Sequence, residues 1–220
     1  MGRLFVIEGC DGSGKATQAK LLEAKLLELE LDVKLIDFPC YDEESSIFIR
    51  RYLAGEYGSS LSDVNCYAAS MFYAVDRYIS FMQSWGDQYY MGTTFVSNRY
   101  STSNAVHQMP KLKQTEWDEF IHWLFDFEYN RLRLPRPDAV IYLDIDSTLS
   151  EQLIMERYNG DRSLMDIHEQ DIEFQRNSRT AALYCAAKEG WTVIDCSEHD
   201  RMRSRESIAE EVYDSIKSQL

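Results

Sequence analysis

The amino-acid sequence predicts an α/β fold, with a five-stranded parallel sheet and helices on both of its faces. Five short apolar runs alternate along the chain with segments of helical periodicity. One of these runs, 139–144, is almost entirely apolar, as expected for a strand that is buried on both faces. In such a sheet, ligands bind where the carboxyl ends of the strands meet. We therefore expect the functional residues at that edge.

The first predicted strand, 4–7, leads through a glycine-rich turn into a helix over 14–30. The other predicted strands are 32–37, 93–97, 139–144 and 191–195. The other predicted helices are 45–54, 61–85, 101–108, 117–129, 147–157, 167–190 and 205–217. Ser62 or Asp63 is expected near the start of the long helix, and Ser147 is expected to cap the helix that begins there. The chain shows no internal repeat and no low-complexity linker, so it predicts one domain over 1–220.

Composition limits the class of protein. The chain has 220 residues, of which 45% are apolar and 27% charged, so it is expected to be globular and soluble. Its net charge of −14 argues against a broad surface for nucleic acid or for an anionic membrane. The five cysteines form no C-x-x-C pair, as is typical of a reduced, cytoplasmic protein. No run has the length of a targeting segment or of a membrane span.

A glycine-dense turn joins the first strand to the first helix. It runs through Gly9, Cys10, Asp11, Gly12, Ser13 and Gly14, and the helix then opens with Lys15, Ala16 and Thr17. Glycines let successive backbone N–H groups surround an anion, and the helix N-terminus adds partial positive charge. Lys15 would place a mobile positive charge on the β- and γ-phosphates of a nucleotide. The order of elements favours a phosphate-binding loop over a turn that binds nothing.

The loop departs at one position from the pattern G-x-x-x-x-G-K-[ST]. Ala16 stands where a hydroxyl group normally ligates Mg²⁺. Thr17 carries a hydroxyl, but one residue further along it points about 100° round the helix. The sequence therefore supports nucleotide binding by this loop more strongly than full catalysis.

Three polar clusters are expected to meet at the carboxyl edge of the sheet. They are the loop 9–15, the segment 37–39 after the second strand, and the segment 98–100 after the third. Arg77 would face them from the long helix. A polar site bounded by cationic side chains is thus predicted at this edge.

These clusters belong to a longer series of motifs. In chain order they read EGCDGSGKATQ, DFPCY, FYAVDRY, NRYSTSNAVHQ, VIYLDID and ERYNGDRSLMDIHE. The series resembles the bacterial thymidylate kinase family, which are P-loop nucleoside-monophosphate kinases. The resemblance implies transfer of the γ-phosphate of ATP to dTMP, with Mg²⁺, in a cytoplasmic homodimer that binds no nucleic acid. It also implies a small lid over about 157–168.

The resemblance implies a role for each matching residue. Lys15 and Arg99, with Arg157 and Arg162 from the lid, would surround the transferring phosphoryl group with positive charge. Asp11 would accept a hydrogen bond from the 3′-hydroxyl of dTMP, and Tyr73 would stack on the thymine. The residues implied to bind the acceptor are Asp11, Phe38, Tyr41, Tyr73, Arg77, Asn98, Arg99, Ser103, Asn104, His107, Gln108 and Glu169. Gly12 stands where some relatives carry an arginine, which assigns that positive charge to the lid.

Departures from the family pattern keep an alternative open. The family has Asp where this chain has Asn98, and an arginine near Cys40 and Tyr41. Ala16 and Asn98 together remove two oxygen groups that usually hold Mg²⁺. The alternative is a nucleotide-binding relative with weak or no kinase activity. A different deoxynucleotide acceptor also stays open, whereas a GTP-driven switch is disfavoured because no N-K-x-D motif is present.

Several of these residues also have a structural interpretation. Arg77 could pair with Asp76 or Glu56, although the motif favours a ligand role, and Tyr73 could belong to the core. Asp144 and Asp146 favour a helix cap or a structural acid over metal ligation. For His122, His168 and His199 we expect solvated or packing roles, because no second ligand lies at metal spacing. No resident metal site is predicted.

Overall fold

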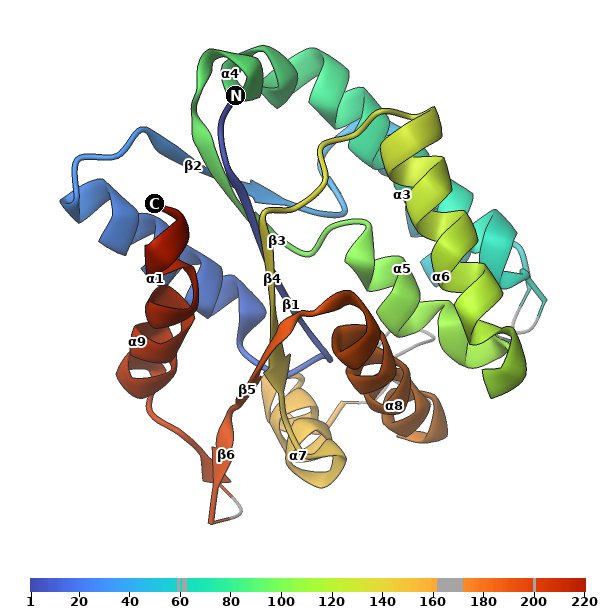
Figure 1. Ribbon diagram of the computed structural model, residues 1–220. Coiled ribbons are helices and arrows are strands. Elements are labelled where there is room, and N and C mark those ends of the chain that lie inside the picture. Colours follow the sequence, from blue (N-terminus) through green and yellow to red (C-terminus); the bar gives the residue numbers. More distant parts are fainter. Residues whose placement is uncertain (59, 61–62, 162–171, 200) are drawn as a thin grey trace.

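The computed structural model describes residues 1–58, 60, 63–161, 172–199 and 201–220. Five strands form one parallel sheet in the order β2-β3-β1-β4-β5 (Figure 1). Their bounds are β1 Leu4–Gly9, β2 Val33–Asp37, β3 Thr94–Asn98, β4 Ala139–Asp144 and β5 Thr192–Asp195. The predicted fold class is confirmed. The central strand β1 is buried throughout, which places the phosphate-binding loop at its end in the middle of the sheet.

Helices cover both faces of the sheet. On one face, Phe5 and Ile7 pack against α1 (Lys15–Glu28) and α9 (Arg205–Ile216). Because side chains alternate along a strand, Leu4 and Val6 point to the opposite face, where they meet a second apolar cluster. The helices on that side are α3 Cys66–Ser80, α5 Thr102–His107, α6 Trp117–Phe125 and α8 Ile172–Glu189. The two layers hold the strand ends rigidly.

The long helix differs from its predicted bounds of 61–85. Its start, α3, lies at Cys66, and Asn65 caps it by accepting a hydrogen bond of 2.8 Å from Ala68 N. Ser62 lies outside the described residues, and Asp63 precedes the helix. A π-helical turn at Phe81–Trp85 continues α3 into α4 (Gly86–Met91), so the helical path runs beyond Trp85. Side-chain capping and the π-turn, which periodicity does not reveal, account for the difference.

The remaining elements are short. A 3₁₀ turn at Glu44–Ser46 leads into α2 (Ile47–Leu53), and 3₁₀ turns also occur at Met109–Lys111, Gln114–Glu116 and Lys217–Gln219. A π-helical turn at Asp126–Arg131 extends α6. The helix α7 (Ser147–Arg157) is capped by Asp146 rather than by Ser147. The small antiparallel pair β6 (Ser197–Glu198) and β7 (Arg201–Met202) was not predicted.

Two general expectations can be compared with the structure. All five cysteines are free thiols. Over the described ranges, no helix is both long enough and apolar enough to cross a bilayer.

Candidate active site

The loop between β1 and α1 adopts the backbone that anion binding requires. Gly12 and Gly14 have φ angles of 80° and 84°, in the left-handed region that glycine adopts without strain. At Gly9, a Cβ would lie 2.8 Å from the carbonyl oxygen of Leu143, so a side chain there would collide with β4. The loop leads directly into the first turn of α1. Its N–H groups are therefore available to phosphate oxygens at a helix N-terminus.

Lys15 lies over this loop. Its Nζ donates a hydrogen bond of 2.8 Å to the carbonyl of Cys10 and lies 3.8 Å from Asp11 Oδ1. Burial, with a further contribution from the positive charge of Arg99, lowers the pKa of Lys15 to about 8. Ala16 is exposed in the first turn of the helix, and Thr17 is half-buried. The buried ammonium group thus has one carboxylate beside it, and an anion bound at the loop would add a second negative charge.

A cavity of about 400 Å³ lies at the carboxyl ends of β1, β2 and β3. It is lined by Asp11, Asp37, Phe38, Pro39, Tyr41, Leu53, Tyr73, Arg77, Asn98, Arg99, Tyr100, Ser103, Asn104, His107, Gln108 and Tyr158. The structure thus brings together every acceptor residue named from the sequence except Glu169. Glu169 and Arg162 lie outside the described residues. Arg157 is the last residue of α7, and its side chain is likewise not among those that the structure describes.

Arg99 forms the polar centre of the cavity. One guanidinium nitrogen donates to Asp11 Oδ1 at 2.5 Å, and another lies 2.7 Å from His107 Nε2. A guanidinium can only donate, so Nε2 accepts and the neutral ring carries its proton on Nδ1. Burial opposes the charge of Arg99, but the carboxylates of Asp11 and Glu8 outweigh it and raise the pKa of Arg99. Arg99 is thereby held charged and fixed in direction.

Asp37 and Asn98 form a second polar pair in the cavity. They are paired residues at the ends of β2 and β3, and Asn98 Nδ2 donates to Asp37 Oδ1 at 2.8 Å. Burial raises the pKa of Asp37, an effect that the hydrogen bond from Asn98 opposes. The Oδ1 atom of Asn98 is buried and has no hydrogen-bond partner in the described part of the chain. The pair presents oxygen atoms to the site.

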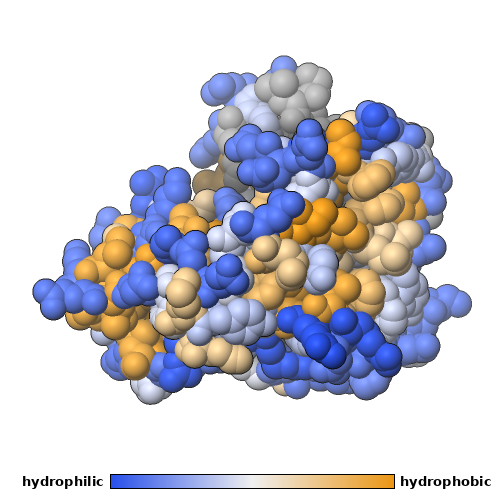
Figure 2. Space-filling view, turned by 90° about the horizontal axis from the view of Figure 1, so that it is seen from above, coloured by the Kyte–Doolittle hydropathy of each residue, from blue (hydrophilic) through white to orange (hydrophobic). Residues whose placement is uncertain are grey.

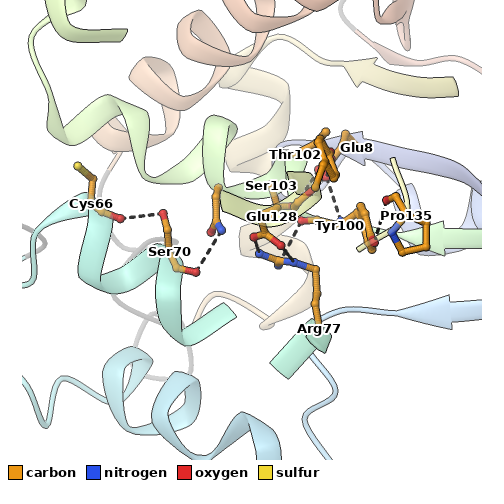
Figure 3. Close-up of polar contacts among 12 residues, drawn as sticks. Glu8, Cys66, Ser70, Arg77, Tyr100, Thr102, Ser103, Glu128 and Pro135 are labelled. Atoms are coloured by element: carbon orange, nitrogen blue, oxygen red, sulfur yellow. Dashed lines mark hydrogen bonds and ion pairs between the residues drawn. The ribbon is translucent and has the colours of Figure 1, made fainter. Parts of the chain in front are cut away.

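The position of α5 is set by a buried carboxylate, Glu8. This residue was not predicted from the sequence. Glu8 accepts hydrogen bonds from Thr102 Oγ1 at 2.6 Å, from Ser103 Oγ at 2.8 Å and from Tyr100 N at 3.2 Å (Figure 3). These bonds join the start of α5 to β1. They set the helix so that Ser103 and the residues after it line the cavity. Its place in the motif EGCDGSGK was the available signal.

Arg77 is paired with a residue that the sequence analysis did not name. Its Nε donates to Glu128 Oε2 at 3.2 Å, and its Nη2 donates a second hydrogen bond to Glu128 Oε1 (Figure 3). The exposed fractions of the two side chains are 2% and 0%. Asp76 instead accepts from Cys40 N at 2.9 Å and from Ser45 Oγ at 2.5 Å. Arg77 therefore reaches the cavity wall as half of a buried ion pair.

Among the residues that the structure describes, the other acids and histidines do not form a metal cage. Asp144 accepts two hydrogen bonds from Arg179, at 2.7 and 2.8 Å, and Asp146 caps α7. His122 and His199 are exposed, and His168 lies outside the described residues. Within the described ranges, no three side chains of the His, Cys, Asp and Glu types gather as metal ligands.

A second hollow lies beyond the phosphate-binding loop, between α7 and the β6–β7 pair. Its volume is about 510 Å³, and it is lined by Asp146, Thr148, Leu149, Gln152, Ser197, Glu198 and His199. Met202 approaches the loop, with its Cε 3.6 Å from where a Cβ of Gly14 would lie. The β6–β7 pair that lines this hollow thus also comes close to the phosphate-binding loop.

Comparison with known proteins identifies relatives over most of the chain. Residues 7–208 match the family model described as thymidylate kinase. The thymidylate kinase of Mycobacterium tuberculosis is 30% identical over 193 residues, covering 86% of this chain and 87% of its own. A probable thymidylate kinase of Pyrobaculum aerophilum is 29% identical over 211 residues, covering 96% and 94%. The solved structure of thymidylate kinase from Candida albicans shares the fold, with a TM-score of 0.67 at 20% identity over 99% of this chain and 92% of its own.

Proposed function

The chain belongs to the thymidylate kinase family, and on that premise we propose that it transfers the γ-phosphoryl group of ATP to dTMP, giving ADP and dTDP. One observation carries the proposal. Asp11 joins Lys15 of the phosphate-binding loop, at 3.8 Å, to Arg99 of the acceptor cavity, at 2.5 Å. A donor phosphate on Lys15 and an acceptor phosphate on Arg99 would therefore be neighbours. Such positioning with charge neutralisation is the main requirement of phosphoryl transfer.

The two hollows are assigned to the two nucleotides. The adenosine of ATP occupies the hollow between α7 and the β6–β7 pair, with its phosphates in the loop 9–17. The base and sugar of dTMP occupy the cavity, where Tyr73 and Phe38 provide ring faces and Asn104 and Gln108 provide polar groups. Asp11 is placed to exchange its ion pair with Arg99 for a sugar hydroxyl. These assignments place the reacting phosphates over Lys15.

Mg²⁺ completes the proposal. When bound, it would neutralise charge on the transferring phosphates. The cavity offers oxygen atoms suited to it, namely the Asp37 carboxylate and the buried, unpartnered Oδ1 of Asn98. Ala16 contributes no ligand. We therefore expect the ion to arrive with ATP and keep several of its waters, rather than to reside in the free protein.

The segment about 157–168 is proposed as a lid, with Arg157, Arg162 and Glu169 acting on the nucleotides when it closes. Two observations support this. A Cβ of Gly12 would lie 3.2 Å from the carbonyl of Ser150, so α7 passes beside the phosphate-binding loop. Tyr158, directly after α7, lines the acceptor cavity. The segment that follows therefore begins next to both nucleotides.

A cytoplasmic homodimer is the proposed state of the protein. Met71, Val75, Tyr78 and Met82 follow one another at helical spacing on α3 and the turn after it, and each is exposed. The view from above in Figure 2 shows hydrophobic areas interspersed with hydrophilic ones on the face that it draws. Val75→Arg combined with Met82→Arg is expected to give a monomer in analytical ultracentrifugation. A wild-type protein that sediments as a monomer would contradict this assignment.

ADP formation tests the proposed function. ATP and Mg²⁺ are supplied with dTMP, dUMP, dCMP or dGMP in parallel, and without an acceptor. Turnover that requires dTMP is the expected result. Turnover with another acceptor would correct the substrate. No turnover with any acceptor, in a protein that still binds ATP, would favour the nucleotide-binding relative.

A further inference from the structure

Among the acids in and beside the cavity, Asp37 has a distinctive environment. Glu8 is fully buried, and both of its oxygens accept hydrogen bonds from α5. Asp11 faces two cations, Arg99 and Lys15. Asp37, in contrast, takes part in no ion pair of the described part of the chain; its carboxylate accepts a hydrogen bond from the amide of Asn98. Asp37 is thus the cavity carboxylate that no cation of its own compensates.

The register of the sheet fixes how Asp37 and Asn98 face each other. They are the last residues of β2 and β3 and lie directly opposite in the parallel ladder. Since a carboxylate only accepts, the NH₂ end of Asn98 must face Asp37. The oxygen of the amide then faces away from Asp37, and it is this atom that is buried without a partner. A buried carbonyl left unpaired costs about 1–3 kcal/mol, so the site favours a donor that fills it.

The pair lies where the phosphate groups are expected. Asn98 is followed directly by Arg99, and the positive charges of Arg99 and Lys15 both act on the Asp37 carboxyl. A carboxylate outside any ion pair of the described residues, with a neighbouring amide oxygen, is a suitable partner for a hydrated magnesium ion, which keeps several waters and takes one or two carboxylates. Oδ1 of Asn98 is buried and without a hydrogen-bond partner in the described residues, so a donor that enters the site beside Asp37, such as a metal-bound water, would complete its hydrogen bonding. The geometry therefore favours contact through metal-bound water.

We propose that Asp37, oriented by Asn98, is the residue that receives the hydrated Mg²⁺ of the nucleotide complex, while Asn98 Oδ1 accepts a hydrogen bond from one of its waters. This rests on the proposed function. It assigns the acid to the end of β2, whereas the family resemblance led us to look for it at position 98. Charge and orientation are divided between two residues. Neither Asp37 nor Asn98 then performs the role alone.

The test measures Mn²⁺ binding by electron paramagnetic resonance, with the full chain, dTMP and a non-hydrolysable ATP analogue. Asp37→Asn removes the charge and keeps the size. In the exchanged variant Asp37→Asn/Asn98→Asp, the same two groups are present with their positions reversed. The matched control is Asp42→Asn, which removes an exposed carboxylate from the following loop. Thermal unfolding and dTMP binding without metal are measured for each variant.

We expect Asp37→Asn to weaken Mn²⁺ binding about tenfold or more, the exchanged variant to recover most of it, and the control to match wild type. Mn²⁺ binding by Asp37→Asn within twofold of wild type would overturn the inference. If Asp37→Asn does not fold, the exchanged variant decides: recovered binding supports the inference, and weak binding in a folded protein refutes it. If the protein turns over dTMP but Asp37→Asn leaves Mn²⁺ binding unchanged, this inference alone is overturned. Mn²⁺ binding that depends on Asp37 without any turnover overturns the proposed function alone.

Discussion

The ion pair between Arg77 and Glu128 provides the sharpest test of how the cavity is built. Glu128→Gln keeps the shape of the side chain and removes its negative charge. The carboxylate accepts from two nitrogens of Arg77, so an amide at this position would turn an N–H group toward a guanidinium that can only donate. The remaining partner of Arg77 is the carbonyl of Tyr100, at 3.4 Å. The substitution therefore leaves a buried cation without a countercharge, held by one amide oxygen and the distant carbonyl of Tyr100.

The expected cost follows from burial. Exposed fractions of 2% and 0% mean that water cannot replace the lost carboxylate. Removing one partner of a buried pair costs about 3–5 kcal/mol. A protein of this size loses about 2–4 °C of melting temperature per kcal/mol, so Glu128→Gln should melt about 6–20 °C below wild type. Asp126→Asn is the matched control, because Asp126 pairs with Arg131 at the surface and its loss should shift the midpoint far less.

Urea denaturation measures the free energy of unfolding, and steady-state kinetics measures KM for dTMP. A second variant, Arg77→Met/Glu128→Leu, removes both charges and should regain much of the stability, because apolar groups of similar volume replace a buried pair with little loss. The KM of this double variant for dTMP should be higher than that of wild type, because Arg77 lines the cavity and is lost. If Glu128→Gln unfolds at the same urea concentration as wild type, the charge of Arg77 does not depend on Glu128 and this reasoning is wrong.

Three further predictions concern the reacting centre. The pKa of Lys15, lowered to about 8, means that its charge costs about 3 kcal/mol in the free protein below pH 8. Lys15→Met should therefore raise the melting temperature relative to wild type at pH 7, and the difference should shrink as pH rises from 8 to 10.5; an unchanging difference would contradict this. Ala16→Ser should raise kcat on the order of tenfold if a missing hydroxyl limits the metal site, and an unchanged kcat would show that it does not. Arg99→Lys loses the planar fork between Asp11 and His107, so KM for dTMP should rise roughly 10- to 100-fold in initial-rate assays; an unchanged KM would exclude Arg99 from acceptor binding.

The parts of this protein that the sequence predicted are those governed by local rules. Five strands, the glycine-rich loop and the meeting of residues 37–39 and 98–100 follow from periodicity and from the geometry of parallel sheets. Asp37 and Asn98 were both expected at this edge. Their hydrogen bond required knowledge of the register between β2 and β3, which no local pattern encodes.

The partners of buried charges could not be predicted in the same way. Arg77 and Glu128 are 51 positions apart, and Glu8 and Thr102 are 94 positions apart. Each contact depends on how helices pack on the sheet, so a search among nearby residues proposed Asp76 or Glu56 for Arg77. The β6–β7 pair was not predicted for another reason. Strands of two residues each are too short to produce a periodic pattern in the sequence.

The charges of the site explain how an acidic chain can bind two anions. The formal net charge is −14, so the protein as a whole repels an anionic nucleotide. Binding must therefore rely on local cations. In the free protein those cations already have partners: Arg99 pairs with Asp11, and Lys15 donates to the carbonyl of Cys10 and lies 3.8 Å from Asp11. A phosphate dianion offers Arg99 and Lys15 a stronger partner than the single carboxylate of Asp11 that they share. The ligand then replaces contacts within the protein, and the side chains of Arg99 and Lys15 are already positioned before it binds. Asp11, no longer paired with Arg99, becomes available to accept a hydrogen bond from a sugar hydroxyl.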